Sequence, residues 1–334
     1  MDHLLEVKNL KVTFDTMSGL VKAVDGVSFT IDKGEIVGLV GESGCGKSVS
    51  QMAITQLIAI PPGKIVSGEV IFEGQDLLKY HHDSDMMRDI RGGQIGMIFQ
   101  EPMTSFNPVF TIGEQIMESL RLHLKLSRST AKKRAIELLG EVGIPDASVR
   151  INHYPHQFSG GMRQRAMIAM ALSCSPKLVI ADEPTTALDV TTQAQVLEVM
   201  MKMVENYHNV LIIVTHNLGI VARHAQRIMV MYAGQIVETG PSEAVFMNPG
   251  HPYTIALLKS VPRLNEKRGR QLIPISGVPP NLINMPPTCS FKPRCSMAND
   301  CHNQPDPELR PVGKNHFVRC HLDVNGEDCG TISE

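Results

Sequence analysis

The sequence of 334 residues predicts an α/β fold: a mixed sheet with an antiparallel β subdomain, an inserted helical subdomain and a C-terminal extension rich in proline and cysteine. Three observations predict it. Apolar runs of strand length recur along the chain, and several lead into helix-like segments. Residues 4–31 roughly alternate apolar and polar side chains, as antiparallel strands do. From about residue 247, prolines and cysteines accumulate. We therefore expect one domain at 1–246, with its helical subdomain at about 102–162, and a second domain at 247–334.

The N-terminal stretch predicts the antiparallel sheet. Apolar residues alternate roughly from Leu5 to Phe14 and recur from Val24 to Phe29, on either side of a Ser-Gly turn at 18–19. Phe14 has two interpretations. Its ring stacks on an adenine base, or it is a half-buried strand residue, which is the commoner situation.

A glycine-rich loop follows the next strand. Residues 35–40 are an apolar run, residues 41–48 match the pattern G-x-x-x-x-G-K-[ST], and a helix-like segment runs from Lys47 to Ile58. Such a loop points its N–H groups inward at the positive end of a helix, which forms an anion site. Lys47 then reaches the β- and γ-phosphates, and the Ser48 hydroxyl lies on Mg²⁺. The predicted nucleotide ligands here are Gly41, Ser43, Gly44, Cys45, Gly46, Lys47 and Ser48.

Two further strands are expected at 68–74 and 95–99, and the second leads into Gln100. Residues 100–108 contain two prolines and no periodicity, which predicts an irregular loop. A glutamine that leaves a core strand can touch Mg²⁺ or the attacking water, although a single Gln is more often a solvated loop residue.

Residues 111–150 are helical by pattern and form the inserted helical subdomain. A second motif, Ser159-Gly160-Gly161, comes next and heads a long helix through Leu172. Ser159 is a natural N-cap, and Ser-Gly-Gly at a helix start exposes several N–H groups to an anion.

Two carboxylates follow a buried strand. Residues 178–181 are apolar, and Asp182 and Glu183 come directly after them, at the carboxyl end where ligands bind parallel sheets. This position predicts that Asp182 holds Mg²⁺ and that Glu183 is the base or orienting group for the attacking water. The alternative is an ordinary pair of exposed acids at a strand end. Residues 187–189 then lead into an amphipathic helix.

The next core strand, 210–215, ends at His216, which can contact the γ-phosphate as a sensor or serve a structural role. Two further strands at 227–232 and 235–238 are joined at Ala233-Gly234 as a hairpin. Beyond residue 247 the many prolines predict little regular structure, so this segment needs a cross-link, such as a metal site, to hold its shape. Five of the seven cysteines lie there: Cys289, Cys295, Cys301, Cys320 and Cys329.

Composition and charge exclude several classes of protein. The formal net charge of −2 argues against nucleic acid as the main partner. The apolar runs are far shorter than the roughly 20 residues of a membrane span. The N-terminus lacks the regions of a secretory signal. We therefore expect a cytoplasmic chain whose role at a membrane depends on partner subunits, and in that compartment clustered cysteines favour a metal site over disulfides.

With these motifs in order, the chain resembles the ABC-type ATPase subunits along essentially its whole length. The resemblance implies a RecA-like P-loop core with Walker A at Gly41–Ser48, the Q-loop at Gln100, the signature at Ser159–Gln164, Walker B at Leu178–Glu183, the D-loop at Ala187–Asp189 and the switch histidine at His216. It implies ATP and Mg²⁺ as ligands, with Ser48, Gln100 and Asp182 on the metal. Lys47, Gln100, Glu183 and His216 would be catalytic. Ser159, Gly160, Gly161, Gln164 and Asp189 would complete the nucleotide site, and Phe14 becomes a candidate for stacking on adenine.

More narrowly, the segments 96–105 and 250–254 and the Cys-rich tail resemble the ATPase subunits of dipeptide and oligopeptide importers, above all the D-type dipeptide subunit. That resemblance implies a head-to-tail pair of ATPase subunits, identical or different, in which the Ser159 motif of one chain covers the γ-phosphate held by the other. It also implies two membrane permease subunits, an extracytoplasmic peptide-binding protein that acts indirectly, and a peripheral position on the cytoplasmic face of the inner membrane.

The tail cysteines Cys289, Cys295, Cys301 and Cys320 suit either zinc or an iron–sulfur cluster. Their spacing is wider than that of zinc knuckles, which favours a cluster, and the resemblance implies [4Fe–4S]. Unligated thiols are the third possibility, and Cys329 is the expected spare.

Other functions stay open at this stage. The cargo could be nickel or another small solute served by the same family. A soluble ABC protein of translation or DNA repair would need a second ATPase module or a long coiled coil, and neither is visible in the sequence. In a third hypothesis the tail senses iron or redox state and hydrolysis is secondary.

Overall fold

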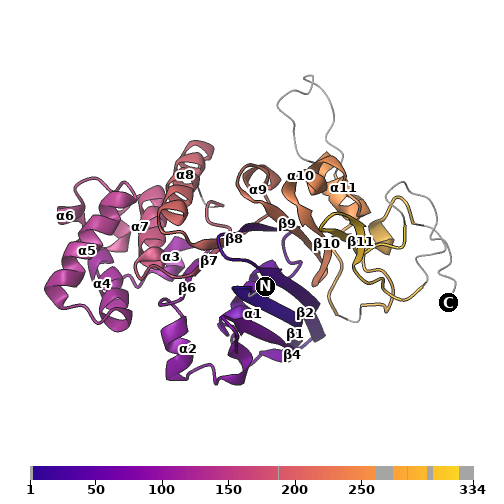
Figure 1. Ribbon diagram of the computed structural model, residues 1–334, viewed down its shortest axis with the longest axis horizontal. Coiled ribbons are helices and arrows are strands. Elements are labelled where there is room, and N and C mark those ends of the chain that lie inside the picture. Colours follow the sequence, from indigo (N-terminus) through magenta and orange to yellow (C-terminus); the bar gives the residue numbers. More distant parts are fainter. Residues whose placement is uncertain (1–2, 187, 261–273, 284, 299–303, 323–334) are drawn as a thin grey trace. The chain divides into compact units, whose positions relative to one another are not determined.

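A computed structural model describes residues 3–186, 188–260, 274–283, 285–298 and 304–322 (Figure 1). The chain divides into two compact units, each of which is discontinuous in sequence. The first comprises residues 1–31, 36–76 and 215–334, and the second comprises residues 32–35 and 77–214. None of the helices in the described ranges combines the length and the apolar character needed to cross a membrane.

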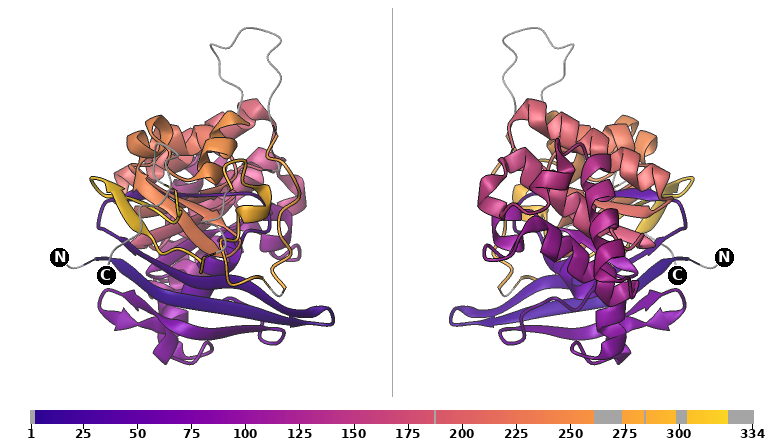
Figure 2. Two further views of the ribbon diagram at one scale, coloured as in Figure 1. Left: turned by 90° about the vertical axis from the view of Figure 1, so that its right-hand side faces the viewer. Right: turned by 90° about the vertical axis from the view of Figure 1, so that its left-hand side faces the viewer.

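The first unit contains the antiparallel sheet that the alternating N-terminal sequence predicts. Its strands are β1 (Leu5–Thr16), β2 (Gly19–Ile31), β4 (Gly63–Phe72) and β5 (Gln75–Asp76), in the order β2-β1-β4-β5. Leu5 lies opposite Ile31 and Thr16 opposite Gly19, so the turn falls at 17–18. The long strands lie side by side in Figure 2. The prediction of antiparallel strands at 4–31 is confirmed.

A second set of strands in this unit carries the glycine-rich loop. The strands are β3 (Ile36–Val40), β9 (Arg227–Tyr232), β10 (Gln235–Pro241), β12 (His316–Val318) and β11 (Arg310–Gly313), paired in that order. β3 and β9 are parallel. Ala233 and Gly234 both have positive φ, 48° and 81°, as a tight hairpin turn requires, so the predicted hairpin is confirmed.

The helices of the first unit are α1 (Lys47–Ile54), α9 (Leu218–His224), α10 (Ser242–Met247), α11 (Pro252–Lys259) and the 3₁₀ helix η3 (Lys292–Arg294). One buried apolar cluster joins residues from both sides of the expected boundary at 246/247, including Val40, Tyr232, Tyr253, Cys289 and Phe291. The described part of the C-terminal segment therefore shares its core with the strands that carry the loop.

The second unit holds a short parallel sheet and most of the helices. Its strands β6 (Ile95–Ile98), β7 (Leu178–Asp182) and β8 (Val210–Thr215) pair in the order β6-β7-β8. Every residue of β7 and β8 is buried, as uninterrupted apolar runs predict. Its helices are η1 (Leu77–Lys79), α2 (Asp85–Ile90), α3 (Pro102–Ser105), α4 (Ile112–His123), α5 (Arg128–Glu141), α6 (Ala147–Arg150), η2 (Pro155–Gln157), α7 (Gly160–Leu172) and α8 (Val190–Asn206).

Side chains cap the starts of α4 and α5. Thr111 and Glu114 form a capping box at α4, and Ser127 accepts a hydrogen bond from the Thr130 N–H at α5. The predicted helices within 111–150 are confirmed. Their number between β6 and β7 agrees with an inserted helical subdomain, whose limits at about 102–162 remain a prediction.

Two local predictions were wrong. Residues 100–108 are not wholly irregular, because Glu101 caps the short helix α3 and Pro102 occupies its first turn, where proline is tolerated. Helix α1 ends at Ile54 rather than 58, since Gln56 adopts a left-handed conformation with φ 51°. The prediction of little regular structure in the tail agrees with the described residues between 274 and 322, where η3, β11 and β12 are the regular elements. β11 and β12 form a hairpin whose second strand pairs with β10.

Candidate functional site

The glycine-rich loop joins β3 to α1 in the first unit. Gly41 packs so closely that a Cβ there would lie 2.2 Å from the Met231 carbonyl oxygen and 2.8 Å from Cys45 Sγ. Gly46 has φ 105° and would place a Cβ 2.2 Å from the Ala23 carbonyl oxygen. Only glycine fits at these two positions, so the sequence motif is explained by the close approach of neighbouring backbone.

Lys47 lies inside this loop and is 5% exposed. Its Nζ donates to the carbonyl oxygens of Gly41 and Glu42, both at 2.9 Å. Ser48 is half-buried in the first turn of α1. Burial raises the pKa of the Cys45 thiol, so Cys45 is a neutral packing residue at neutral pH. A buried ammonium beside a helix N-terminus gives the loop the charge and donors that a phosphate group needs.

The two predicted carboxylates follow one another at the end of β7 in the second unit. Asp182 is the last strand residue and is 6% exposed. Glu183 leaves the strand in the left-handed region with φ 45°, a conformation that is uncommon for a residue other than glycine and that concentrates at functional sites. The change of conformation separates the environments of the two side chains, since Glu183 is half-buried whereas Asp182 is buried.

The Glu183 carboxylate is oriented by two donors. Gln100 Nε2 and Thr186 Oγ1 each lie 2.9 Å from Glu183 Oε2. The structure therefore brings Gln100 to Glu183, across 83 residues of sequence. Thr186 was not predicted. Pro184 directly after Glu183 is typical of a turn and could have indicated it, and in the structure the Thr186 N–H reaches the Glu183 carbonyl at 3.3 Å.

The Ser159 motif starts α7 as expected. Ser159 Oγ accepts from the Met162 N–H at 3.3 Å, and Ser159 is exposed while Gly160 and Gly161 are half-buried. A Cβ on Gly161 would meet Thr192 Cγ2 at 2.6 Å, which explains this glycine by the close approach of α8. The motif thus presents an exposed helix N-terminus.

Gln164 differs from its neighbours in the motif because it is 2% exposed. It shares the buried face of α7 with Met167, Ile168 and Ala171, at helical spacing. This periodicity could have been recognised in the sequence, and it separates Gln164 from the exposed Ser159. Contact of Gln164 with a nucleotide remains a prediction from the family pattern.

Asp189 caps α8. Its carboxylate accepts from the Thr192 N–H at 3.0 Å, and this hydrogen bonding lowers the pKa of Asp189. Ala187, which belongs to the predicted D-loop, lies outside the described residues.

His216 and Phe14 both belong to the first unit. His216 is exposed and follows directly after β8. Phe14 is half-buried in β1, where it pairs with Val21 and with Gly63, and a Cβ on Gly63 would lie 2.9 Å from the Phe14 ring. These contacts explain Phe14 as a strand residue, and stacking on adenine remains a prediction.

Three of the predicted cluster cysteines lie within the described residues. Cys289 and Cys320 are buried and Cys295 is half-buried. Burial raises the pKa of Cys289 to about 11, and the Cys320 thiol adds to this rise, while Cys289 in turn contributes to the raised pKa of Cys295. Cys289 therefore interacts electrostatically with both Cys320 and Cys295. Cys301 and Cys329 fall outside the described residues.

The chain is similar to known proteins along nearly its whole length. A family model described as ABC transporter matches residues 24–186, and one described as oligopeptide/dipeptide transporter, C-terminal region, matches residues 237–301. The oligopeptide transport ATP-binding protein OppD of Bacillus subtilis (strain 168) is 51% identical over 320 residues, which span 96% of this chain and 89% of that protein. The dipeptide transport ATP-binding protein DppD of Escherichia coli (strain K12) is 46% identical over 322 residues, 96% of this chain and 97% of that protein.

A solved structure of similar fold is the dimeric ATP-binding cassette MJ0796 in a post-hydrolysis state bound to ADP and Pi. Its similarity has a TM-score of 0.63 at 29% identity and spans 71% of this chain and 98% of that one.

Proposed function

Because this chain belongs to the family of ABC transporter ATP-binding subunits of oligopeptide and dipeptide importers, we propose that it binds and hydrolyses ATP to energise uptake of di- or oligopeptides through partner membrane subunits. The observation that carries the proposal is the loop around Lys47. A buried ammonium, close-packed glycines and a helix N-terminus together form a site for the phosphates of a nucleotide.

Mg²⁺ would be held by Ser48, Gln100 and Asp182. Their side chains offer a hydroxyl, an amide carbonyl and a carboxylate, which are the oxygen donors that Mg²⁺ prefers. A bound Mg²⁺ neutralises charge on the transferred phosphoryl group. We assign this role by residue type and by the family pattern.

Hydrolysis would depend on Glu183. Its carboxylate accepts hydrogen bonds from Gln100 and Thr186 on one oxygen, which fixes the group for contact with an attacking water through the other. His216 would contact the γ-phosphate. Ser159, Gly160 and Gly161 would cover the γ-phosphate bound by a second ATPase subunit, since their exposed helix start duplicates the anion site already present at Lys47.

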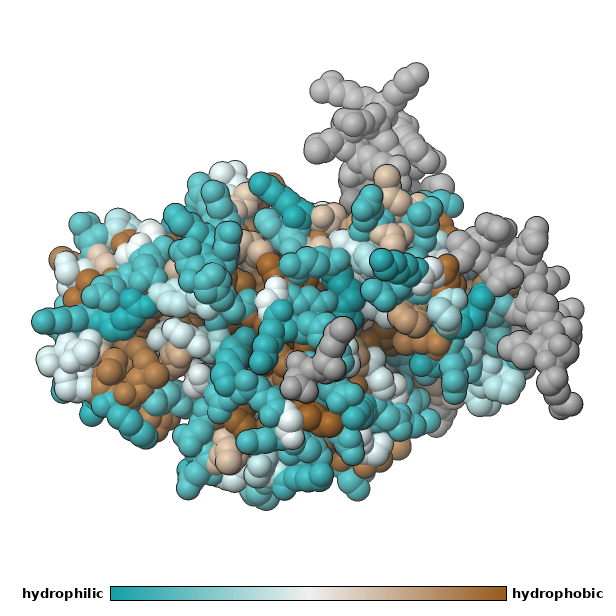
Figure 3. All heavy atoms as spheres, in the orientation of Figure 1, coloured by the Kyte–Doolittle hydropathy of each residue, from teal (hydrophilic) through white to brown (hydrophobic). Residues whose placement is uncertain are grey.

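Partner permeases would dock on the helical part of the second unit. Large apolar side chains that are exposed there include Val109, at 70%, and Phe110, at 50%. Phe110 also borders a groove of about 540 Å³ whose other lining residues belong to α4 and the start of α5. Apolar side chains gather on the surface around α4 in Figure 3. Exposed apolar patches of this kind mark interaction sites.

Co-purification tests the partners and the cargo together. Affinity-tagged chain extracted from membranes should carry two membrane proteins and a second ATPase or a second copy. Proteoliposomes containing that assembly and the external binding protein should accumulate labelled dipeptide only with ATP. Uptake of Ni²⁺ in place of peptide would support the alternative cargo.

Phe110→Asp should release the membrane proteins, whereas Val149→Asp, at an exposed position on α6 of the same unit, should retain them.

The tail cysteines would hold a [4Fe–4S] cluster, with zinc as the alternative. Cys289, Cys295 and Cys320 supply soft sulfur donors. Burial of Cys289 disfavours its thiolate unless a cation offsets the charge. Iron, acid-labile sulfide and zinc are measured on protein purified without oxygen. Iron and sulfide in equal amounts should be lost in Cys289→Ser and retained in Cys174→Ser, a buried cysteine of the second unit. Unchanged transport with lower thermal stability in Cys289→Ser would indicate a structural tail, and transport that follows iron supply would indicate a sensor.

A further inference from the structure

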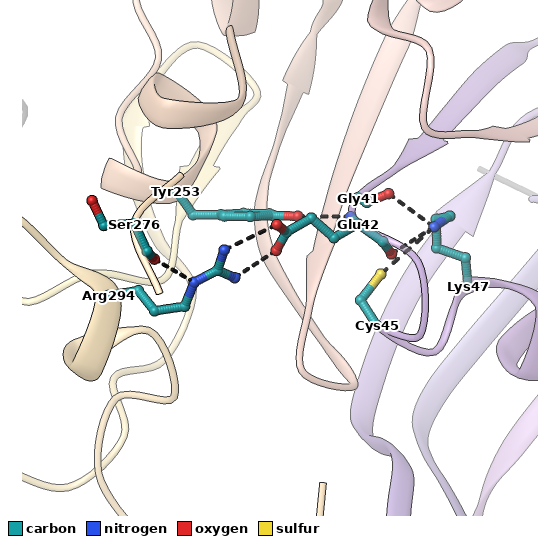
Figure 4. A network of polar contacts seen from close by, with 7 residues as sticks. All are labelled: Gly41, Glu42, Cys45, Lys47, Tyr253, Ser276 and Arg294. Atoms are coloured by element: carbon teal, nitrogen blue, oxygen red, sulfur yellow. Dashed lines mark hydrogen bonds and ion pairs between the residues drawn. The ribbon is translucent and has the colours of Figure 1, made fainter. Parts of the chain in front are cut away.

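The phosphate loop is bound from the C-terminal segment through Glu42, the residue that follows Gly41. Arg294 Nη1 lies 2.6 Å from Glu42 Oε2, and Arg294 Nη2 lies 3.0 Å from Glu42 Oε1. This is a bidentate ion pair, the geometry in which a guanidinium fixes a carboxylate most firmly. The two residues are 252 positions apart in sequence and belong to the same compact unit (Figure 4).

Arg294 is itself held rigidly. Its side chain is 4% exposed, its Nε donates to the Ser276 carbonyl at 2.9 Å, and its guanidinium carbon lies 5.8 Å from the ring centroid of Tyr232. Hydrogen bonding to Glu42 raises the pKa of Arg294, so the pair stays charged. A buried guanidinium whose position is fixed restrains the loop more firmly than a mobile surface lysine would.

A second contact reaches the same loop residue. The Tyr253 hydroxyl accepts a hydrogen bond from the Glu42 N–H at 2.8 Å, and Tyr253 is fully buried. Tyr253 is placed by the first turn of α11, where His251 Nδ1 accepts from the Tyr253 N–H at 3.0 Å. The buried Glu238 in turn accepts from the N–H groups of Gly250 and His251, at 2.8 and 2.9 Å. This chain of hydrogen bonds gives the Gly-His-Pro-Tyr segment a physical role.

All three polar groups of Glu42 are therefore occupied. The carboxylate is bound by Arg294, the N–H by Tyr253 and the carbonyl oxygen by Lys47, at 2.9 Å. Figure 4 shows Arg294 and Lys47 on opposite sides of Glu42. Any shift of Glu42 would move both the loop backbone and the carbonyl that orients Lys47.

We propose that Arg294 and Tyr253 are positioning residues for ATP: they hold Glu42 so that the loop keeps its phosphate-binding conformation, and the C-terminal segment thereby sets nucleotide affinity. The inference rests on the proposed function, in which residues 41–48 bind ATP. Neither residue is assigned contact with the nucleotide. Their effect is on the geometry of the loop and belongs to binding rather than to the hydrolytic step.

The test measures ATP affinity on the full-length protein, by titration with a fluorescent ATP analogue. Tyr253→Phe removes a single hydroxyl and should raise Kd about three- to tenfold, the usual effect of losing one hydrogen bond. Arg294→Met should raise Kd by roughly tenfold or more, because it leaves the loop carboxylate without its charged partner. Arg294→Lys keeps the charge without the bidentate geometry, so its affinity for ATP should lie between those of Arg294→Met and wild type.

Glu42→Gln separates positioning from simple charge. If Arg294 acts by holding Glu42, then Glu42→Gln weakens ATP binding and the double variant with Arg294→Met is no weaker than the worse single one. If the carboxylate only repels phosphate, Glu42→Gln tightens ATP binding, and that result would overturn the proposal. The matched control is Arg319→Met. This arginine also lies in the C-terminal segment and pairs with Asp306 at 3.2 Å.

The outcomes separate a failure of the proposed function from a failure of the positioning role. Wild-type protein that fails to bind ATP, or a Lys47→Ala variant that binds it normally, would refute the proposed function. Normal ATP binding by wild type, loss in Lys47→Ala and unchanged affinity in Arg294→Met and Tyr253→Phe would refute only the positioning role. Lower thermal stability with unchanged Kd would show that the contacts serve the fold alone.

Discussion

The phosphate loop and the Glu183 carboxylate are held in different ways. The loop is fixed by its own buried Lys47 and by two buried side chains from distant parts of the first unit, Tyr253 and Arg294. Lys47 is 5% exposed, Tyr253 is 0% exposed and the Arg294 side chain is 4% exposed. The Glu183 carboxylate, in the second unit, is oriented by Gln100 and Thr186, both of which are exposed.

This difference has a consequence for function. The hydrogen bonds of Glu42 are part-buried and those of Glu183 are exposed. Hydrogen bonds shielded from water fix one conformation more firmly than exposed ones, which exchange readily with water. The loop proposed to bind nucleotide is therefore built in advance by the first unit. The carboxylate proposed for hydrolysis, in the second unit, is adjustable, which suits a group that reaches its final arrangement only when ATP and a second subunit are bound.

The largest expected effect is that of Lys47→Ala. Removal of the ammonium should raise the Kd for ATP by roughly 100-fold, since losing a charged hydrogen-bond partner costs on the order of 3 kcal/mol. Hydrolysis should fall with binding. Both are measured on the same preparation, with Lys177→Ala as a control on a surface lysine. Equal affinity in Lys47→Ala and wild type would contradict a loop built for phosphate.

Two glycines of the loop differ in how closely other atoms approach them. Gly41→Ala should lower the free energy of unfolding by about 2 kcal/mol or more, because its Cβ would overlap the Met231 carbonyl. Gly44→Ala has open space around its Cβ and only a left-handed φ of 79°, so it should cost about 1 kcal/mol.

Thermal unfolding midpoints check this order, and ATP titration should show the same ranking. A larger loss of stability in Gly44→Ala than in Gly41→Ala would show that backbone conformation, rather than close packing, limits the loop.

A smaller effect is expected at the carboxylate. Thr186→Ala should lower the hydrolysis rate by roughly three- to tenfold, the effect of one hydrogen bond, with little change in ATP affinity. Gln100→Ala should lower the rate at least as much, because Gln100 is also a proposed ligand of Mg²⁺. Because both donors act on one oxygen of Glu183, the double variant should lose less than the product of the single losses. Steady-state ATPase assays on the assembled transporter measure all three variants, and strictly multiplicative losses would show that the two donors act independently.

Local sequence signals predicted much of this molecule. The alternation at 4–31, the apolar strands before Gly41 and Asp182, and the cap residue Ser159 all depend on neighbours within a few positions, and the structure agrees with them. The helix of residues 102–105 was missed because proline-rich loops and proline-initiated first turns look alike in sequence.

Contacts between distant segments were not predictable in this way. Arg294 and Tyr253 lie in a segment whose prolines suggested little structure, and nothing near them in sequence points to Glu42. Gln164 is instructive in another way. Its spacing from Met167 and Ile168 indicates the buried face of its helix, whereas the motif alone indicates contact with nucleotide.

The most direct test of the account measures binding and turnover on one protein, Glu183→Gln. The amide keeps the shape of the side chain and removes its charge, so hydrolysis should fall by about 10²- to 10⁴-fold. The Kd for ATP should stay within about threefold of wild type, because the loop at residues 41–48 and its contacts with Arg294 and Tyr253 are unchanged. ATP hydrolysis at the wild-type rate, or a loss of affinity as large as the loss of turnover, would contradict the division between a prebuilt binding loop and an adjustable hydrolytic carboxylate.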